Sequence, residues 1–175
     1  MEFEKLIMAR RSARGYDNAI DEATLREAIS RARFAPSWKN SQESRVYAAL
    51  TPETAQKVFD ALPDFNRNSS ANATLIVTTF VKGIAGFNAA GQPTGSAGDC
   101  WGAYDLGLHD AYLILALQDL GYDSLIMGLS DEKALKEIFQ IPENEQIMSV
   151  IAVGRRSKPA AAPVRKPLEE TLIAK

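Results

Sequence analysis

An arginine-rich cluster near the start of the chain is the first group of residues that could do chemistry. Arg10, Arg11, Ser12 and Arg14 place three guanidinium groups and one hydroxyl within five residues. Arginine forks bind phosphate oxygens in pairs, so this spacing suits a phosphate group. A solvated basic segment at a helix end, where cations offset the helix dipole, would have the same composition. The cluster by itself leaves both interpretations open.

A second polar group lies in the segment APSWKNSQ, residues 35–42. Its candidate ligand-binding residues are Pro36, Ser37, Trp38, Asn40 and Gln42. An amide both donates and accepts, so the Asn40 and Gln42 side chains match a ring edge that carries N–H and C=O groups. The alternative is a plain turn that is rich in turn-forming residues.

Two further segments carry weaker signals. Gly128, which follows Met127, would let the backbone approach a flat ligand closely, although taken alone a simple glycine turn between strand and helix explains it better. The C-terminal segment is basic, and any one of its cations could return to a phosphate unless they are all solvated. These cations are Arg155, Arg156, Lys158, Arg165 and Lys166.

Several functional classes are excluded by composition. Cys100 is the only cysteine and His109 the only histidine, which rules out an internal disulfide and a zinc site built on several such ligands. No Cys–His or Ser–His arrangement is apparent, so we expect no catalytic protein nucleophile and no metal. His109 lies in the most apolar predicted helix, and we expect it to be packed or capping rather than catalytic.

Charge and hydropathy point to a water-soluble protein. The formal net charge of -2 provides no basic field for nucleic acid. No apolar run approaches the roughly 20 residues that a membrane span requires. The first residues lack the apolar core of a signal peptide, so we expect a cytoplasmic protein.

Local patterns predict the elements that must position these residues. Helices are expected over 1–9, from an Asp21 cap to before Pro36, from a Thr51 cap to Pro63, over 103–119, and after a Ser130 cap. Strands are expected over 44–50, 74–81, 123–127 and 146–153. The helix over 103–119 is apolar on nearly all sides, which indicates burial, with a subunit partner as a natural cover.

The same patterns predict one domain over residues 1–175. Helices and strands mix without strict alternation, which favours an α+β fold over a doubly wound sheet. The glycine-rich segment 82–99 is expected to be a mobile excursion, or else a merely disordered loop. The segment from about 155 to 175, with its prolines, is expected to be an extended tail.

Taken in order, four segments resemble the nitroreductase family. They are RRSARGY, APSWKNSQ, DLGLHDAYLILALQDLGYDSLIMG and IAVGRRSKPAAAPVRKPLEE, and together they cover almost the whole chain. The resemblance implies a mostly antiparallel central sheet flanked by helices, an intertwined homodimer, and FMN bound where the subunits meet.

The resemblance also implies roles for individual residues. Arg10 and Ser12, within the cluster that includes Arg11, would hold the flavin phosphate and ribityl chain, and Arg14 would lie toward the pyrimidine edge. Arg165 would complete the phosphate site. The remaining implied contacts are Pro36, Ser37, Trp38, Asn40 and Gln42 from the other subunit, Asn66 or Asn68 before the central strand, and Met127 and Gly128 beside the ring.

The function implied is an NAD(P)H-dependent FMN oxidoreductase that reduces a small nitroaromatic, quinone or enone acceptor by a ping-pong mechanism, with the chemistry carried by the flavin. An FMN-holding storage or sensor protein with little turnover is the alternative. A cofactor-free dimerisation module is a third hypothesis, although clustered arginines would repel one another without an anion. Some family members have a glutamate where this chain has Met127, so only backbone contacts are expected there.

Overall fold

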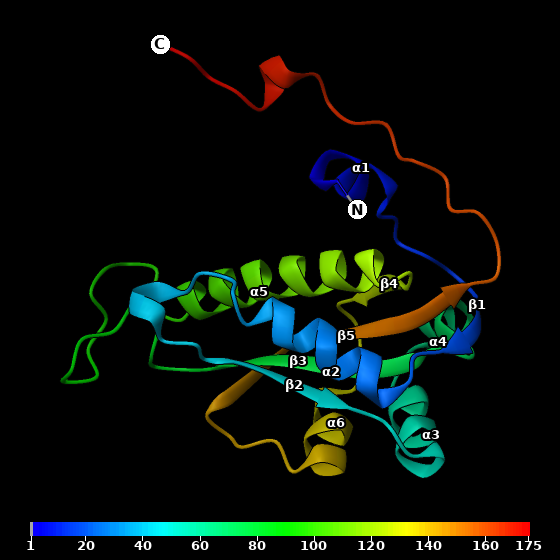
Figure 1. Cartoon of the computed structure of the whole chain (residues 1–175). Coiled ribbons are helices and arrows are strands. Elements are labelled where there is room, and N and C mark those ends of the chain that lie inside the picture. Colours follow the sequence, from blue (N-terminus) through cyan, green and yellow to red (C-terminus); the bar gives the residue numbers. More distant parts are fainter. Residues whose placement is uncertain (1) are drawn as a thin grey trace.

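The structure, a computed structural model, describes residues 2–175 and contains one five-stranded sheet with helices on both faces (Figure 1). The strands are β1 (Tyr16–Ala19), β2 (Ser44–Ala48), β3 (Thr74–Val81), β4 (Asp123–Met127) and β5 (Glu145–Arg156). The helices are α1 (Phe3–Ala9), α2 (Glu22–Ala32), α3 (Pro52–Asp60), α4 (Asp64–Ser70), α5 (Cys100–Asp119) and α6 (Glu132–Phe139), with short 3-10 turns η1 (Trp38–Asn40) and η2 (Leu168–Glu170). The first predicted helix includes Met1, which lies outside the described residues.

The long strand β5 organises the sheet. It pairs with β1, β3 and β4, and β2 extends the sheet beyond β3. Every one of these strand pairs is antiparallel. The α+β fold with a mostly antiparallel sheet is therefore confirmed.

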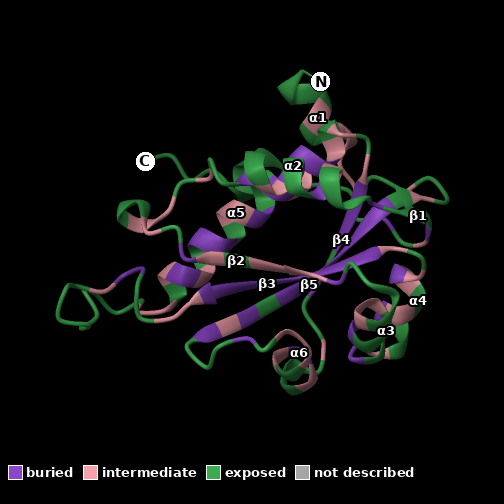
Figure 2. Cartoon of the chain, turned by 60° about the horizontal axis from the view of Figure 1, so that its bottom comes forward, coloured by how far each residue is buried: buried purple, intermediate pink, exposed green. Residues whose placement is uncertain are grey.

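The sheet separates two apolar cores. On one face, α2 and α5 bury Leu25 and Leu113 against Ile76 of β3. On the other face, α3 and α6 bury Val58 and Leu135 together with core side chains of β3 and β5. Successive β3 residues serve opposite cores because strand side chains alternate in direction. Figure 2 shows the resulting band of buried central strands between partly exposed helices.

Two predicted helix starts are confirmed by their capping contacts. The Asp21 carboxylate accepts a hydrogen bond from the Thr24 amide at 2.9 Å, at the start of α2. The Thr51 hydroxyl accepts from the Thr54 amide at 3.2 Å, and Pro52 is the first residue of α3. Both contacts satisfy amides that have no partner within the helix.

A third predicted cap was wrong. Asp131, and not Ser130, caps α6, and its carboxylate accepts from the Ala134 amide at 3.0 Å. The cap must stand three residues before the amide it accepts from, and the helix begins one residue later than the Ser130 assignment required.

One strand and one α-helix were missed, and two elements were predicted too short: β5, and α5, which begins at Cys100 rather than at residue 103. The strand β1 has only Tyr16 buried, so it lacks a clear alternating pattern. The helix α4 has the polar sequence DFNRNSS, which carries no apolar repeat. The strand β5 continues past the predicted end at Val153 to Arg156, because β1 supplies a pairing partner for its last residues.

The segment 82–99 is described throughout and forms turns rather than a regular helix or strand. Its base is held by hydrogen bonds from the Gly83 amide to the Asp99 carboxylate and from the Lys82 amide to the Asn144 carbonyl, both at 2.7 Å. Gly86 has a φ of 81°, and a Cβ there would lie 2.6 Å from the Trp101 ring. The base of the segment is therefore anchored, and its mobility stays a prediction.

The corrected cap of α6 can be tested directly. We expect Asp131→Ala to destabilise the protein by about 1 kcal/mol, because the Ala134 amide loses its acceptor. The melting temperature should fall by about 2–4 °C, measured by circular dichroism. Ser130→Ala is the matched control and should leave the melting temperature unchanged; a larger loss from Ser130→Ala would restore the original assignment.

Candidate functional site

The arginine cluster lies in the short connection between α1 and β1. Arg10 ends α1, and its amide donates to the Leu6 carbonyl at 3.1 Å. The next residues run beside β4, where Ser12 bridges to Ser124 and the Ala13 amide donates to the Ser124 carbonyl at 3.0 Å. The backbone of the cluster is thus fixed against the sheet, while the Arg14 side chain stays exposed.

The C-terminal tail returns to this cluster and closes a cavity of about 330 Å³. The cavity is lined by Arg10, Arg11, Ser12, Arg14, Ala161, Pro163 and Arg165. No acidic side chain between residues 2 and 175 pairs with any of these four arginines. Like charges held together destabilise a fold unless an anion offsets them, so this cavity is suited to a phosphate or a similar group.

The second cluster forms a tight loop around η1. Lys39, Asn40 and Gln42 all have left-handed backbone angles, with φ of 47°, 57° and 51°. The Ser37 hydroxyl accepts from the Gln42 amide at 3.0 Å across the loop. The Trp38 ring packs on Trp101 with 4.8 Å between ring centroids. The loop is therefore a built structure and not a loose turn.

A separate cavity of about 220 Å³ lies beside this loop. Its lining includes Pro36, Ser37, Gln42, Asp105 and His109, and neither Trp38 nor Asn40 contributes to it. It shares no lining residue with the arginine-lined cavity. Within one chain, the two predicted clusters are therefore not brought together.

The remaining predicted contacts lie near the end of β4. Asn66 is buried on α4, and its side-chain amide donates to the Leu129 carbonyl at 3.0 Å, next to Gly128. Asn68, on the same helix, is exposed, and among the described residues its side chain makes no hydrogen bond like that of Asn66. Gly128 is exposed with open space around it, whereas the Met127 side chain is buried in the core. Asn66 is thus the asparagine placed beside the predicted ring-binding backbone.

Two of the basic residues assigned to the tail belong to the sheet. The Arg156 amide donates to the Asp123 carboxylate at 3.2 Å, and its guanidinium lies 3.6 Å from the same carboxylate. The Arg155 guanidinium lies 5.0 Å from the centre of the Tyr122 ring. These contacts are structural, which leaves Arg165 as the tail cation that lines the arginine-lined cavity.

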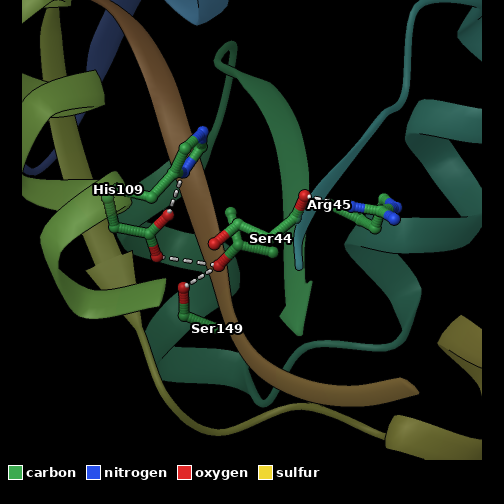
Figure 3. A network of polar contacts seen from close by, with 6 residues as sticks. Ser44, Arg45, His109 and Ser149 are labelled. Carbon is green, nitrogen blue, oxygen red and sulfur yellow. Dashed lines mark hydrogen bonds and ion pairs between the residues drawn. The ribbon is translucent and has the colours of Figure 1, made fainter. Parts of the chain in front are cut away.

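A buried polar network on α5 was not predicted. The Asp110 carboxylate accepts from the Thr78 hydroxyl at 2.9 Å, and that hydroxyl lies 2.9 Å from the Ser149 hydroxyl (Figure 3). His109 Nδ1 lies 3.4 Å from the same carboxylate, and its side chain is 12% exposed. The packed role predicted for His109 is confirmed. Acidic residues within the most apolar helix were the available signal for this network, since buried carboxylates require partners.

Metal and membrane sites find no support in the described chain. Over residues 2–175, His, Cys, Asp and Glu side chains form no group of three or more that could hold a metal ion. No helix in that range is long and apolar enough to cross a membrane.

Fold and cavity together define an antiparallel α+β protein with a cationic cavity where a returning tail meets the sheet. The chain belongs to the nitroreductase family, whose defining sequence pattern matches residues 7–155. The predicted family membership is therefore confirmed.

Individual relatives agree with this assignment. A protein of Archaeoglobus fulgidus, named as a candidate NADH dehydrogenase/NAD(P)H nitroreductase, is 28% identical over 155 residues, which are 86% of this chain and 83% of that protein. A nitroreductase family protein from Streptococcus pneumoniae TIGR4 superposes with a TM-score of 0.85 at 20% identity, over 99% of this chain and 100% of that one. A candidate nitroreductase from Exiguobacterium sibiricum 255-15, solved in complex with FMN, has a TM-score of 0.86 at 20% identity, over 100% of this chain and 98% of that one. At these identities the two solved structures establish the fold alone.

The arginine-lined cavity predicts anion-dependent stability. Inorganic phosphate at about 100 times its dissociation constant should stabilise the protein by about 2.7 kcal/mol, which corresponds to a rise of roughly 5–10 °C in melting temperature. Arg10→Ala should lose most of this rise in a thermal-shift titration. Arg26→Ala, which removes an exposed arginine paired with Glu22 at 2.6 Å, is the control and should keep it. An equal response from both variants would exclude a phosphate role for Arg10.

Proposed function

We propose that the chain is an FMN-dependent oxidoreductase that takes reducing equivalents from NAD(P)H and passes them to a small nitroaromatic, quinone or enone acceptor by a ping-pong mechanism. The observation that carries the proposal is the cavity lined by four arginines, none of which has an acidic partner among residues 2–175. Membership of the nitroreductase family supports it, and so does the FMN held by the Exiguobacterium sibiricum protein of the same fold.

The residues around the cavity fit the phosphate end of FMN. Arg10 and Arg165 would donate paired N–H groups to phosphate oxygens, and Ser12 is exposed, so its hydroxyl could add a further hydrogen bond. Arg14, on the same short segment, would supply positive charge toward the pyrimidine edge. When bound, FMN supplies the hydride transfer chemistry. The protein contributes binding, orientation and a fixed cation that stabilises developing negative charge.

The β4 end fits the flat part of such a cofactor. Gly128 leaves open space over the backbone, so a planar ligand can approach it closely. Asn66 is held in place by the Leu129 carbonyl and shapes the same corner. Met127 supports this corner from the core and would offer only its backbone to a ligand.

We further propose that the working protein is an intertwined homodimer that completes the site from two subunits. The outward face of α5 is apolar, whereas the exposed face of a water-soluble helix is usually polar. Tyr112 and Leu115 on this face, together with Phe3 and Leu6 of α1, line a groove of about 500 Å³. The tail carries apolar side chains into solvent, among them Val164 at 96% and Ile173 at 80% exposure. Exposed apolar surface of this kind marks association sites.

Such a dimer would explain why the second cluster stands apart from the arginines. The loop carrying Pro36, Ser37, Trp38, Asn40 and Gln42 would meet the cofactor bound by the other subunit. Segment 82–99 would be a flap on the same single domain, with its apex free to move while its base stays anchored.

Cofactor content and reduction test the enzymatic proposal. The purified protein should be yellow, release FMN rather than FAD on heating, and lose its flavin absorption under anaerobic NADH or NADPH, because the nicotinamide reduces the bound cofactor. Re-oxidation by a panel of nitroaromatic, quinone and enone compounds would then identify the acceptor class. A bound flavin that stays oxidised with both nucleotides would instead favour a storage or sensor protein, and a colourless protein that takes up no FMN would overturn the proposal.

Mixed dimers test whether the site is shared. R10A/R165A and S37A/N40A should each bind FMN poorly when expressed alone, through loss of the phosphate contacts or of the loop contacts. After co-expression with random pairing, about one quarter of the sites should be intact, since each mixed dimer restores one of its two sites. FMN per subunit, measured by absorbance, reports the outcome. No recovery in mixed dimers would contradict a site built from two subunits.

A further inference from the structure

Two buried carboxyl groups meet beneath the loop of residues 37–42. Glu43 precedes β2 and is 1% exposed, and Asp105 lies on α5 and is 4% exposed. Burial raises the pKa of Glu43, and Asp105 is the acidic group that acts on this carboxyl and raises its pKa further. Isolated carboxylates are rarely buried in this way because desolvation costs a charged group far more than a neutral one.

Each carboxyl also accepts a hydrogen bond from the loop. The Asp105 carboxylate accepts from the Trp38 amide at 2.6 Å. The Ser41 hydroxyl donates to Oε2 of Glu43. Between these two points lie Lys39 and Asn40, both with left-handed backbone angles. Asparagine tolerates this conformation, but for lysine it costs free energy that the surroundings must offset.

The hydrogen bonds around the Glu43 carboxyl indicate which of its oxygens carries a proton. Oε1 of Glu43 is buried and receives no hydrogen bond from any donor among the described residues. A proton on this oxygen, shared with Asp105, would give the unpartnered atom a hydrogen bond and would remove the repulsion between two neighbouring carboxylates. Burial, reinforced by Asp105, raises the pKa of Glu43, although the Ser41 hydroxyl opposes the rise.

We propose that Glu43 and Asp105 share one proton and act as a positioning pair that holds the 37–42 loop in its left-handed shape, so that loss of the proton loosens the loop. The consequence for cofactor binding rests on the proposed function, in which this loop meets the FMN of the other subunit. The consequence for folding does not.

Other charged groups face the same region and must be separated from the pair. Arg33 after α2, Arg45 on β2 and His109 on α5 line the cavity to which Asp105 contributes. Arg45 donates to the Gln42 and Ser44 carbonyls at 2.9 Å. His109 is the other ionisable side chain of this cavity that a pH experiment must separate from the pair.

The sign of the effect follows from the raised pKa of Glu43. Between its ordinary value and its raised value, the folded protein holds a proton that the unfolded chain has released. The stability that this proton provides is present at low pH and is lost as pH rises through the raised pKa. A carboxylate stabilised by an ion pair would give the opposite trend.

The experiment compares melting temperature, tryptophan emission and FMN affinity between pH 5 and pH 8.5 in the full chain. For the wild type, the melting temperature should fall across this range by about 4 °C more than in Glu43→Gln. The FMN dissociation constant should rise about tenfold over the same range, because a loosened loop must be ordered again when the cofactor binds. Emission should shift as well, because Trp38 in the loop packs on Trp101, and these are the two tryptophans of the chain.

Variants separate the pair from its surroundings. Glu43→Gln keeps a neutral group that can donate to Asp105 and accept from Ser41, so it should retain the loop and flatten the pH response. Asp105→Asn should flatten it too, because the neighbouring carboxyl can then ionise without repulsion. His109→Gln and the exposed-site control Glu137→Gln should keep the wild-type response.

The outcomes are distinct. A pH response that persists in Glu43→Gln, or that disappears in His109→Gln, would overturn the positioning pair, and so would a wild type with no response. If the protein bound no FMN at any pH, the proposed function would fail, while melting temperature and emission would still decide the role of the pair. Should Asp105→Asn not fold, Glu43→Gln alone decides it.

Discussion

Repulsion among clustered arginines is the physical constraint on which the rest of this structure depends. Four guanidinium groups line one cavity, three from a segment pinned against β4 and one from the returning tail. Because none has a carboxylate partner in the described chain, their charge is offset only by water or by a bound anion. A fold that positions these side chains on fixed backbone would bind an anion without first having to bring the cations together.

The sheet explains how distant segments reach that site. β5 pairs with β1, β3 and β4, so the connection after α1, the start of β4 and the start of the tail all lie at the C-terminal end of this one strand. Arg155 stacks over the Tyr122 ring and Arg156 pairs with Asp123, so both arginines fasten the end of β5 to the start of β4. The tail beyond them is then directed across the arginine cluster, which Figure 1 shows as the chain passing over the α1 side of the molecule.

The other end of the molecule is organised by polar groups inside an apolar helix. Asp105 holds the Trp38 loop, and Asp110 holds Thr78 and, through it, Ser149 on β5. Buried carboxyls are costly unless they are fully hydrogen-bonded, so these contacts lock α5 to the sheet and to the loop in one register. The same helix leaves an apolar face with Tyr112 and Leu115 outward, and a second subunit would cover it.

The sequence alone determined those features whose causes lie within a few residues. The caps at Asp21 and Thr51 and the spans of β3 and β4 followed from local hydrogen bonding and side-chain pattern. The arginine spacing singled out the segment that lines the cationic cavity. Tertiary structure decided the rest. The polar helix α4 and the short strand β1 form because neighbouring elements supply their packing and hydrogen-bond partners, and Arg155 and Arg156 belong to β5 because β1 pairs with them. Glu43 and Asp105 are neighbours in space although 62 positions separate them in the sequence. Long-range pairing leaves no local signal, because it depends on which surfaces the folded chain brings together.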